Sequence, residues 1–230
     1  MKITLKDGSI KEYGSPISVY DIARDISEGL ARAACAAVLN GKVVDLRTIV
    51  NEDSELGILT FQDEEGKAAY RHTTSHVLAE AVKRLYPEAK LAIGPSIDTG
   101  FYYDFDCPSF DREALDKIEA EMKKIIKEGA KLECFTLPRD EAIKFMEERD
   151  EPYKVELIRD LPEDSVISFY SQGEFTDLCA GPHLMSTKQI KAFKLISSSG
   201  AYWRGSEKNK MLTRIYGTAF DKKADLAEYL

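Results

Sequence analysis

The chain has 230 residues, of which 43% are hydrophobic and 31% charged, a composition typical of a folded globular protein rather than a disordered chain. With 32 basic and 40 acidic residues its net charge is −8, which excludes a uniformly basic nucleic-acid binder but not a local basic surface. No apolar run is long enough for a membrane helix, and the N-terminus carries no apolar signal segment, so we expect a cytoplasmic protein without a membrane partner. Its four cysteines form no CxxC pair, which favours free thiols.

The pattern over residues 1–62 predicts a small β-rich domain. Residues 2–5 alternate polar and apolar side chains, and residues 10–13 are the expected return strand of a hairpin. Ser18 is a typical helix cap, with an acidic residue three positions later. Further strands are expected at 33–39 and 56–61. Two strands, a helix and more strands in this order indicate a ubiquitin-like β-grasp.

Residues 63–224 are expected to form a second domain, an α+β unit with a mainly antiparallel sheet and packed helices. The polar stretch Gln62–Gly66 indicates the boundary between the two domains. The helix expected at 112–128 has one apolar face and a glycine directly after it. Other helices are expected at 70–86, 140–149 and from 221 onward, and strands at 131–137, 165–170, 189–196 and 212–220.

Basic residues are concentrated near the C-terminus. Residues 186–223 carry a net charge of +7, while residues 1–185 carry −13. Aromatic side chains lie among these basic groups, an arrangement that suits a phosphate backbone with an unstacked base. A solvated sheet face would give the same charge pattern. The candidates for nucleic-acid binding are Lys188, Arg204, Lys208, Lys210 and Arg214.

All three histidines fall in two short motifs. His72 and His76 are four residues apart on an expected helix, so both side chains leave the same face. Cys179 and His183 are also four apart, in a segment that Gly-Pro marks as a loop. Three imidazoles and a thiolate can close a tetrahedral zinc site, whereas histidines that merely cap or pack have no need of this pairing.

Three chemistries can use this set of residues. A zinc ion can acidify a bound water for hydrolysis. A histidine can instead act on a water without any metal, with a lysine and Asp177 positioning the substrate. Finally, a histidine can activate Cys179 as a nucleophile. The residues alone leave these three open.

Five segments in order resemble the N-terminal part of bacterial threonyl-tRNA synthetases. They are HTTSHVLAEAV at 72–82, GPSIDTGFYYDF at 94–105, PYKVELI at 152–158, TDLCAGPH at 176–183 and GAYWRGSEKNKMLTRIYGTAF at 200–220. The first domain resembles the TGS domain of that family, and the second its editing domain. The resemblance implies that residues 225–230 begin a linker helix to a catalytic core outside this chain.

The resemblance implies a proofreading activity, the hydrolysis of serine wrongly attached to the tRNA for threonine. Carried over by motif, the catalytic residues are His72, His76, Lys154, Asp177, Cys179 and His183. His72 would orient or deprotonate the attacking water, Lys154 would stabilise the developing charge, and Asp177 would pair with the serine ammonium or hydroxyl. Gly94, Tyr102 and Tyr103 are candidates for walls of the substrate pocket.

The implied partners are the acceptor end of the tRNA for threonine and the rest of a synthetase chain, with serine as the product. No cofactor is expected in this part of the chain. Related editing domains of the alanyl type carry a zinc site on the same motifs, so His72, His76, Cys179 and His183 are the alternative metal ligands. Zinc, ATP and magnesium, and the contacts of a dimer, are expected only for the catalytic core. A non-catalytic RNA-binding role is the alternative from a different functional class.

Overall fold

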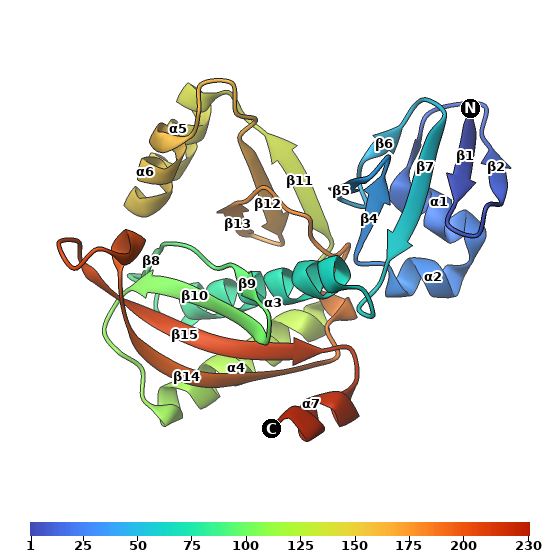
Figure 1. Cartoon of the computed structure of the whole chain (residues 1–230). Coiled ribbons are helices and arrows are strands. Elements are labelled where there is room, and N and C mark those ends of the chain that lie inside the picture. Colours follow the sequence, from blue (N-terminus) through green and yellow to red (C-terminus); the bar gives the residue numbers. More distant parts are fainter.

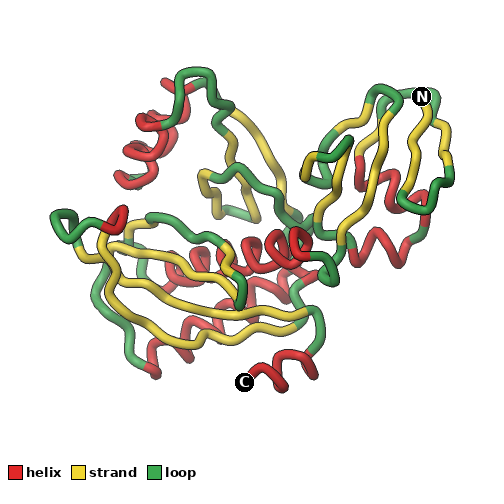
Figure 2. Tube along the Cα trace, viewed as in Figure 1, coloured by secondary structure: helices red, strands yellow, loops and turns green.

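The structure is a computed structural model that describes all 230 residues. Its elements gather into three blocks, each built from a sheet with helices beside it (Figures 1 and 2). The mixture of helices with mostly antiparallel sheets confirms the predicted α+β class. No helix combines the length and the apolar character that crossing a membrane requires.

The first block is a five-stranded sheet with two short helices, the arrangement expected of a β-grasp. Strand order is β2-β1-β7-β4-β5, in which β1 and β7 are parallel and the other pairs antiparallel. A separate two-stranded pair, β3 with β6, lies beside it. The strands are β1 (Lys2–Leu5), β2 (Ile10–Glu12), β3 (Ile17–Ser18), β4 (Ala36–Leu39), β5 (Lys42–Val44), β6 (Ile49–Val50) and β7 (Ser54–Leu59).

The two helices of this block are α1 (Val19–Ile26) and α2 (Glu28–Ala33). The side chain of Ser18 accepts a hydrogen bond from the backbone N–H of Asp21, so the predicted cap of α1 is confirmed. Helix α2 is capped in the same way by Ser27. Its last residue, Ala33, was expected at the start of a strand, which begins only at Ala36. Alanine suits a helix as well as a buried strand, so the apolar run was ambiguous.

The long helix α3 (Glu64–Leu85) connects the first block to the second. It begins six residues before the expected position, within the polar stretch that we interpreted as a boundary. Gly66 lies where a Cβ atom would be 1.8 Å from the carbonyl oxygen of Thr60, so this turn of the helix packs directly against the preceding backbone. Phe61 and Leu59 of the first block share a core with Tyr70 and Val77 of α3. The two blocks are therefore joined by a common apolar core.

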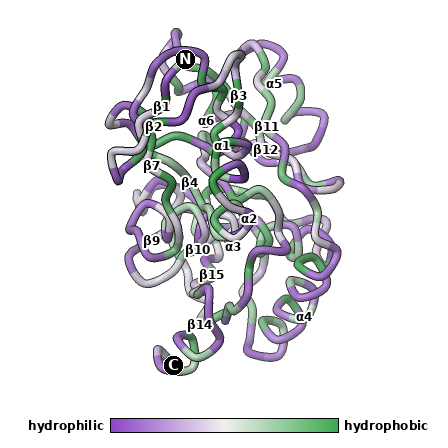
Figure 3. Tube along the Cα trace, turned by 90° about the vertical axis from the view of Figure 1, so that its right-hand side faces the viewer, coloured by the Kyte–Doolittle hydropathy of each residue, from purple (hydrophilic) through white to green (hydrophobic).

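The second block is an antiparallel sheet in the order β14-β15-β10-β8, covered on one face by α3 and α4 (Figure 1). Its strands are β8 (Lys90–Leu91), β10 (Gly100–Asp106), β14 (Ala192–Tyr202) and β15 (Met211–Phe220), with β9 (Ser96–Ile97) paired to β10. Helix α4 (Arg112–Glu128) has the predicted bounds. Asp111 caps its start, and Gly129 ends it with a φ of 65°. Hydrophobic and hydrophilic residues alternate along this helix in Figure 3.

The third block holds a three-stranded sheet and two helices. The sheet has the order β11-β12-β13, with strands β11 (Leu132–Thr136), β12 (Ser168–Gln172) and β13 (Phe175–Leu178). The helices are α5 (Arg139–Glu148) and α6 (Pro152–Asp160), and their apolar sides form a small core with Phe169. The remaining helices are the short η1 (Thr187–Gln189) and η2 (Trp203–Gly205), and α7 (Lys223–Tyr229). Strand β13 and α6 carry two of the predicted site residues.

Candidate functional site

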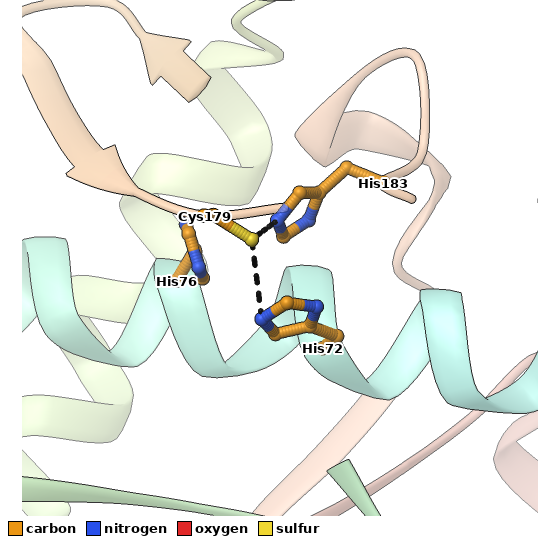
Figure 4. Close-up of side chains that lie close together, drawn as sticks. All are labelled: His72, His76, Cys179 and His183. Atoms are coloured by element: carbon orange, nitrogen blue, oxygen red, sulfur yellow. Dashed lines mark hydrogen bonds between the residues drawn. The ribbon is translucent and has the colours of Figure 1, made fainter. Parts of the chain in front are cut away.

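The two histidines of the first motif lie one turn apart on α3, facing the loop that follows β13 (Figure 4). Their ring centroids are 5.0 Å apart. His76 is buried, while His72 is partly exposed. The neighbouring threonines and Ser75 are buried on the same helix, so this segment is held on nearly all sides.

The second motif meets the first from the opposite side. Cys179 Sγ lies 3.1 Å from His183 Nε2 and 3.5 Å from His72 Nε2 (Figure 4). The turn between Cys179 and His183 requires a glycine, because Gly181 has a φ of +72° and a Cβ there would lie 2.1 Å from the hydroxyl of Tyr170. One potential ligand atom from each of His72, His76, Cys179 and His183 lies within 4.8 Å of all the others. The structure thus brings together the four residues of the two motifs.

The buried ring of His183 is fixed by Thr73, which sequence reasoning did not single out. The Thr73 hydroxyl donates to the carbonyl of Ala69, and it lies 2.9 Å from His183 Nδ1. A hydroxyl has one hydrogen, so Nδ1 is the donor in this contact and Nε2 carries the lone pair. That lone pair points at Cys179 Sγ. The only sequence signal for Thr73 was its position between the two histidines of α3.

Lys154, Asp177 and Tyr103 form a second cluster beside the histidines. Lys154 Nζ lies 2.9 Å from Asp177 Oδ1, and their side chains are only 4% and 1% exposed. The hydroxyl of Tyr103, on β10, donates to Asp177 Oδ2 at 2.6 Å. His76 Nε2 is 3.7 Å from the same oxygen and joins the two clusters. Oδ1 of Asp177 is paired with Lys154 alone.

Burial sets the charge states of these groups. It lowers the pKa of His72 to about 3, with a further contribution from His76, and lowers the pKa of His76 to about 4. Burial also places the pKa of His183 well below its usual range. Burial raises the pKa of Asp177 more than any other single effect, but the charge of Lys154, the neighbouring His76 and the hydrogen bond from Tyr103 together outweigh it and hold that pKa below its ordinary value. The site thus combines neutral imidazoles with an ionised lysine–aspartate pair.

Cys179 is a poor nucleophile in this environment. Burial raises the pKa of its thiol to about 12, so the thiol stays protonated at neutral pH. Its S–H can donate to the free Nε2 of His183, while the N–H of Gly181 donates to the sulfur. Nucleophilic attack by this cysteine is therefore disfavoured by the burial of its thiol, although a histidine nitrogen lies within hydrogen-bond distance of the sulfur.

Of the three candidate wall residues, Gly94 and Tyr103 adjoin the site. A Cβ at Gly94 would lie 2.0 Å from the ring of Tyr103, so Gly94 permits that ring to reach Asp177. Tyr102 lies on the opposite face of the sheet. There the Arg214 guanidinium covers its ring at 3.9 Å, and the ring of Tyr216 is its neighbour.

The five basic candidates do not form one uninterrupted surface. Lys188 lies on η1, away from the other four, which come from the β14–β15 hairpin and β15. Arg214 pairs with Asp104 at 2.7 Å, and Lys210 with Asp106 at 2.9 Å. Arg204 pairs with Asp160 and Glu156. Acidic residues from outside residues 186–223 thus offset much of the charge that the sequence placed there. Lys208 is exposed, and no acidic side chain contacts it.

Two stretches of the chain match models of known domain families. Residues 1–60 match the model of the TGS domain. Residues 167–216 match the model of the threonyl and alanyl tRNA synthetase second additional domain. The latter range includes Asp177, Cys179 and His183, but not the histidines of α3. The predicted likeness to the N-terminal part of bacterial threonyl-tRNA synthetases is therefore supported by both domains in the expected order.

Comparison over the whole length of this chain finds threonine–tRNA ligases. The chain is 67% identical to the threonine–tRNA ligase of Acetivibrio thermocellus, 68% to that of Clostridium botulinum strain Eklund 17B and 62% to that of Clostridium acetobutylicum. In each case all of this chain is covered, but only 36% of the relative. The similarity to the N-terminal part of these ligases, predicted from the motifs, is confirmed. The chain spans about a third of the length of the curated relatives it matches.

Proposed function

We propose that this chain hydrolyses the ester bond between serine and the tRNA for threonine. A threonine–tRNA ligase faces serine as a competitor, because serine differs only by one missing methyl group. That methyl is worth about 1–3 kcal/mol of discrimination, too little for accurate charging. A second site that removes serine after attachment solves the problem. For the whole protein we propose ligation of threonine to its tRNA, a reaction that consumes ATP and uses magnesium and zinc.

The observation that carries the proposal is the buried pair Lys154–Asp177 beside three neutral imidazoles. An aminoacyl ester brings an ammonium group, and Asp177 is an ionised carboxylate whose Oδ1 is paired with Lys154 alone. Lys154 supplies a fixed positive charge for the oxyanion or for the departing ribose oxygen. A buried acidic and a buried basic group thus lie beside the histidines, one suited to each end of the ester.

His72 orients the attacking water rather than taking its proton outright. With a pKa of about 3 its ring is neutral at physiological pH, but a base that weak gains little by accepting a proton in the ground state. A neutral ring can still hold a water by its free nitrogen. His72 is the partly exposed histidine of the cluster, so water can reach it.

Selectivity against threonine follows from crowding at the substrate β-carbon. The side chains of His76, Asp177 and His183 are buried and closely packed. Adding a methyl group to a filled, rigid site costs about 1–3 kcal/mol. If the methyl also displaces the attacking water, the reaction loses its nucleophile, and discrimination grows further.

The experiment is single-turnover deacylation of seryl-tRNA and threonyl-tRNA by the chain. We expect release of serine, with His72→Ala and Lys154→Ala each lowering the rate constant at saturating substrate more than they weaken binding. Lys144→Ala, which removes an exposed lysine of α5, is the matched control and should behave as wild type. A wild-type chain that binds tRNA without releasing either amino acid would overturn the proposal in favour of a non-catalytic RNA-binding role.

A zinc-dependent version of the same reaction is the second candidate. It is favoured by the mutual approach of ligand atoms from His72, His76, Cys179 and His183. The free Nε2 of His183, with Nδ1 held by Thr73, is the arrangement that zinc ligands usually have. If three of these four side chains held the metal, its fourth position would be left for a water, which it would acidify. We propose the metal-free reaction, in which chelator leaves the rate unchanged; loss of activity with chelator and recovery with zinc would select the second candidate.

A further inference from the structure

The loop between β5 and β6 of the first block reaches into the second motif of the site. Leu46 in this loop is fully buried in the β-grasp core, and its two neighbours, Asp45 and Arg47, point toward the other blocks. The carbonyl of Leu46 also accepts from Tyr20 at 2.8 Å, which ties the loop to α1. The loop is therefore a rigid part of the first block.

Arg47 donates to three backbone carbonyls, two of them at the end of the second motif and one on β11. Its Nη2 donates to the carbonyls of Leu184 at 2.7 Å and Leu132 at 2.8 Å. Its Nη1 donates to the carbonyl of His183 at 3.2 Å. A planar guanidinium makes such divergent contacts at once, which a lysine cannot. The side chain is only 17% exposed, so water competes little for these bonds.

Asp45 and Arg47 together form a clamp on the backbone of His183. Asp45 Oδ2 accepts from the N–H of His183 at 3.1 Å and from the hydroxyl of Tyr170 at 2.8 Å, and its Oδ1 accepts from Arg47 at 2.8 Å. The Tyr170 ring in turn lies 4.5 Å from the ring of His183. Both backbone polar groups of His183 are thus bound by side chains of the first block, while its ring is bound by Thr73 and Cys179.

We propose that Asp45 and Arg47 are positioning residues for His183, so that the β-grasp block is a structural part of the hydrolytic site. The loop from Cys179 to His183 has only a short strand before it and no helix to hold it. A catalytic group must be held within about 0.5 Å of its productive place, and a displacement of 1 Å can cost about a hundredfold in rate. The clamp supplies that restraint from outside the domain that carries the motifs. The effect on rate rests on the proposed function, whereas the effect on His183 does not.

The test compares Arg47→Lys and Asp45→Asn with wild type in the full chain. Arg47→Lys keeps the positive charge but loses the planar guanidinium group with its several N–H donors. Asp45→Asn keeps the shape of the side chain but loses its negative charge. The matched controls are Arg24→Lys and Asp21→Asn, an exposed pair of α1 in the same block with a contact of 3.0 Å. Circular dichroism checks that each variant is folded. If Arg47→Lys does not fold, the milder change Asp45→Asn still tests the proposal.

NMR signals test the positioning of His183, and the deacylation rate tests the proposed hydrolysis, so the two can fail separately. The chain has three histidines, so the ring ¹⁵N and ¹³C signals of His183 can be assigned by NMR. We expect the Arg47 and Asp45 variants, but not the controls, to shift or broaden the ring signals of His183 more than those of the other two histidines. We also expect these variants to lower the single-turnover rate about ten- to a hundredfold, with little change in the tRNA concentration that gives half of the maximal rate. Unchanged His183 signals in folded variants would overturn the positioning role, whatever the rate. Shifted signals without hydrolysis in any protein, wild type included, would uphold it and refute the proposed function.

Discussion

Replacing Lys154 by methionine should destabilise the chain far more than a surface lysine substitution does. Methionine keeps most of the side-chain volume but removes the positive charge, which leaves Asp177 ionised and nearly fully buried. Removing one partner of a buried ion pair costs about 3–5 kcal/mol, because the other charge stays without compensation. Tyr103 and His76 still contact Asp177, so we expect the lower end, about 3 kcal/mol.

The loss of stability caused by Lys154→Met should become smaller as the pH falls. In wild type the pKa of Asp177 is held below its unfolded value, so this group contributes stability above the unfolded pKa of about 4 and loses it as pH falls through the folded pKa. Without Lys154, burial dominates and raises the folded pKa above the unfolded value. The variant then gains relative stability when the carboxyl is protonated. The difference between the two proteins should therefore be largest at neutral pH and shrink toward pH 4.

Urea unfolding at pH 7 and at pH 4.5 measures this. Trp203 is the only tryptophan and packs against Tyr153 of α6, so its fluorescence reports on the block that carries Lys154. The control is Lys117→Met, which removes one member of an exposed pair with Glu113 and should cost less than about 0.5 kcal/mol. A double variant, Lys154→Met with Asp177→Leu, should cost less than the sum of its parts. Equal costs for Lys154→Met and Lys117→Met, or strict additivity, would refute the reasoning.

Three further outcomes are expected. Cys179→Ala should reduce hydrolysis without abolishing it, because the protonated thiol is not the nucleophile; a thioester trapped on rapid quenching and seen by mass spectrometry would contradict this. The deacylation rate should show no histidine titration between pH 5 and 8, since the pKa values of His72 and His76 lie near 3 and 4 and both rings stay neutral there; a rate that falls with a midpoint near 6.5 would argue otherwise. Binding of tRNA should weaken strongly with salt, and Lys208→Ala should weaken it more than Lys210→Ala, whose charge Asp106 already offsets; filter binding at two salt concentrations decides.

Local signals predicted some elements well and others poorly. Helix α4 was predicted with its bounds because an apolar face and a glycine end mark it in the sequence. The start of α3 was missed because Glu64 and Glu65 look like a linker, whereas acidic residues also suit the first turn of a helix. Gly66 reinforced the error, since its role is a close backbone contact with Thr60 that no sequence pattern reveals.

The functional site was likewise predicted only in part from the sequence. The spacing of the histidine and cysteine motifs predicted that four side chains face a common point, and the structure places them there. The depth of burial that sets their charge states depends on the packing of α3 and could not be derived from spacing. Asp45 and Arg47 lie more than 130 residues before His183, and their contacts come from the docking of two blocks.

The proposed site distinguishes two amino acids by one methyl group. The most direct measurement is the ratio of single-turnover deacylation rates on seryl-tRNA and threonyl-tRNA, with the same tRNA for both. Crowding at the β-carbon alone predicts a ratio of roughly ten to two hundred in favour of serine, and displacement of the attacking water would raise it. Equal rates on the two substrates would contradict the claim.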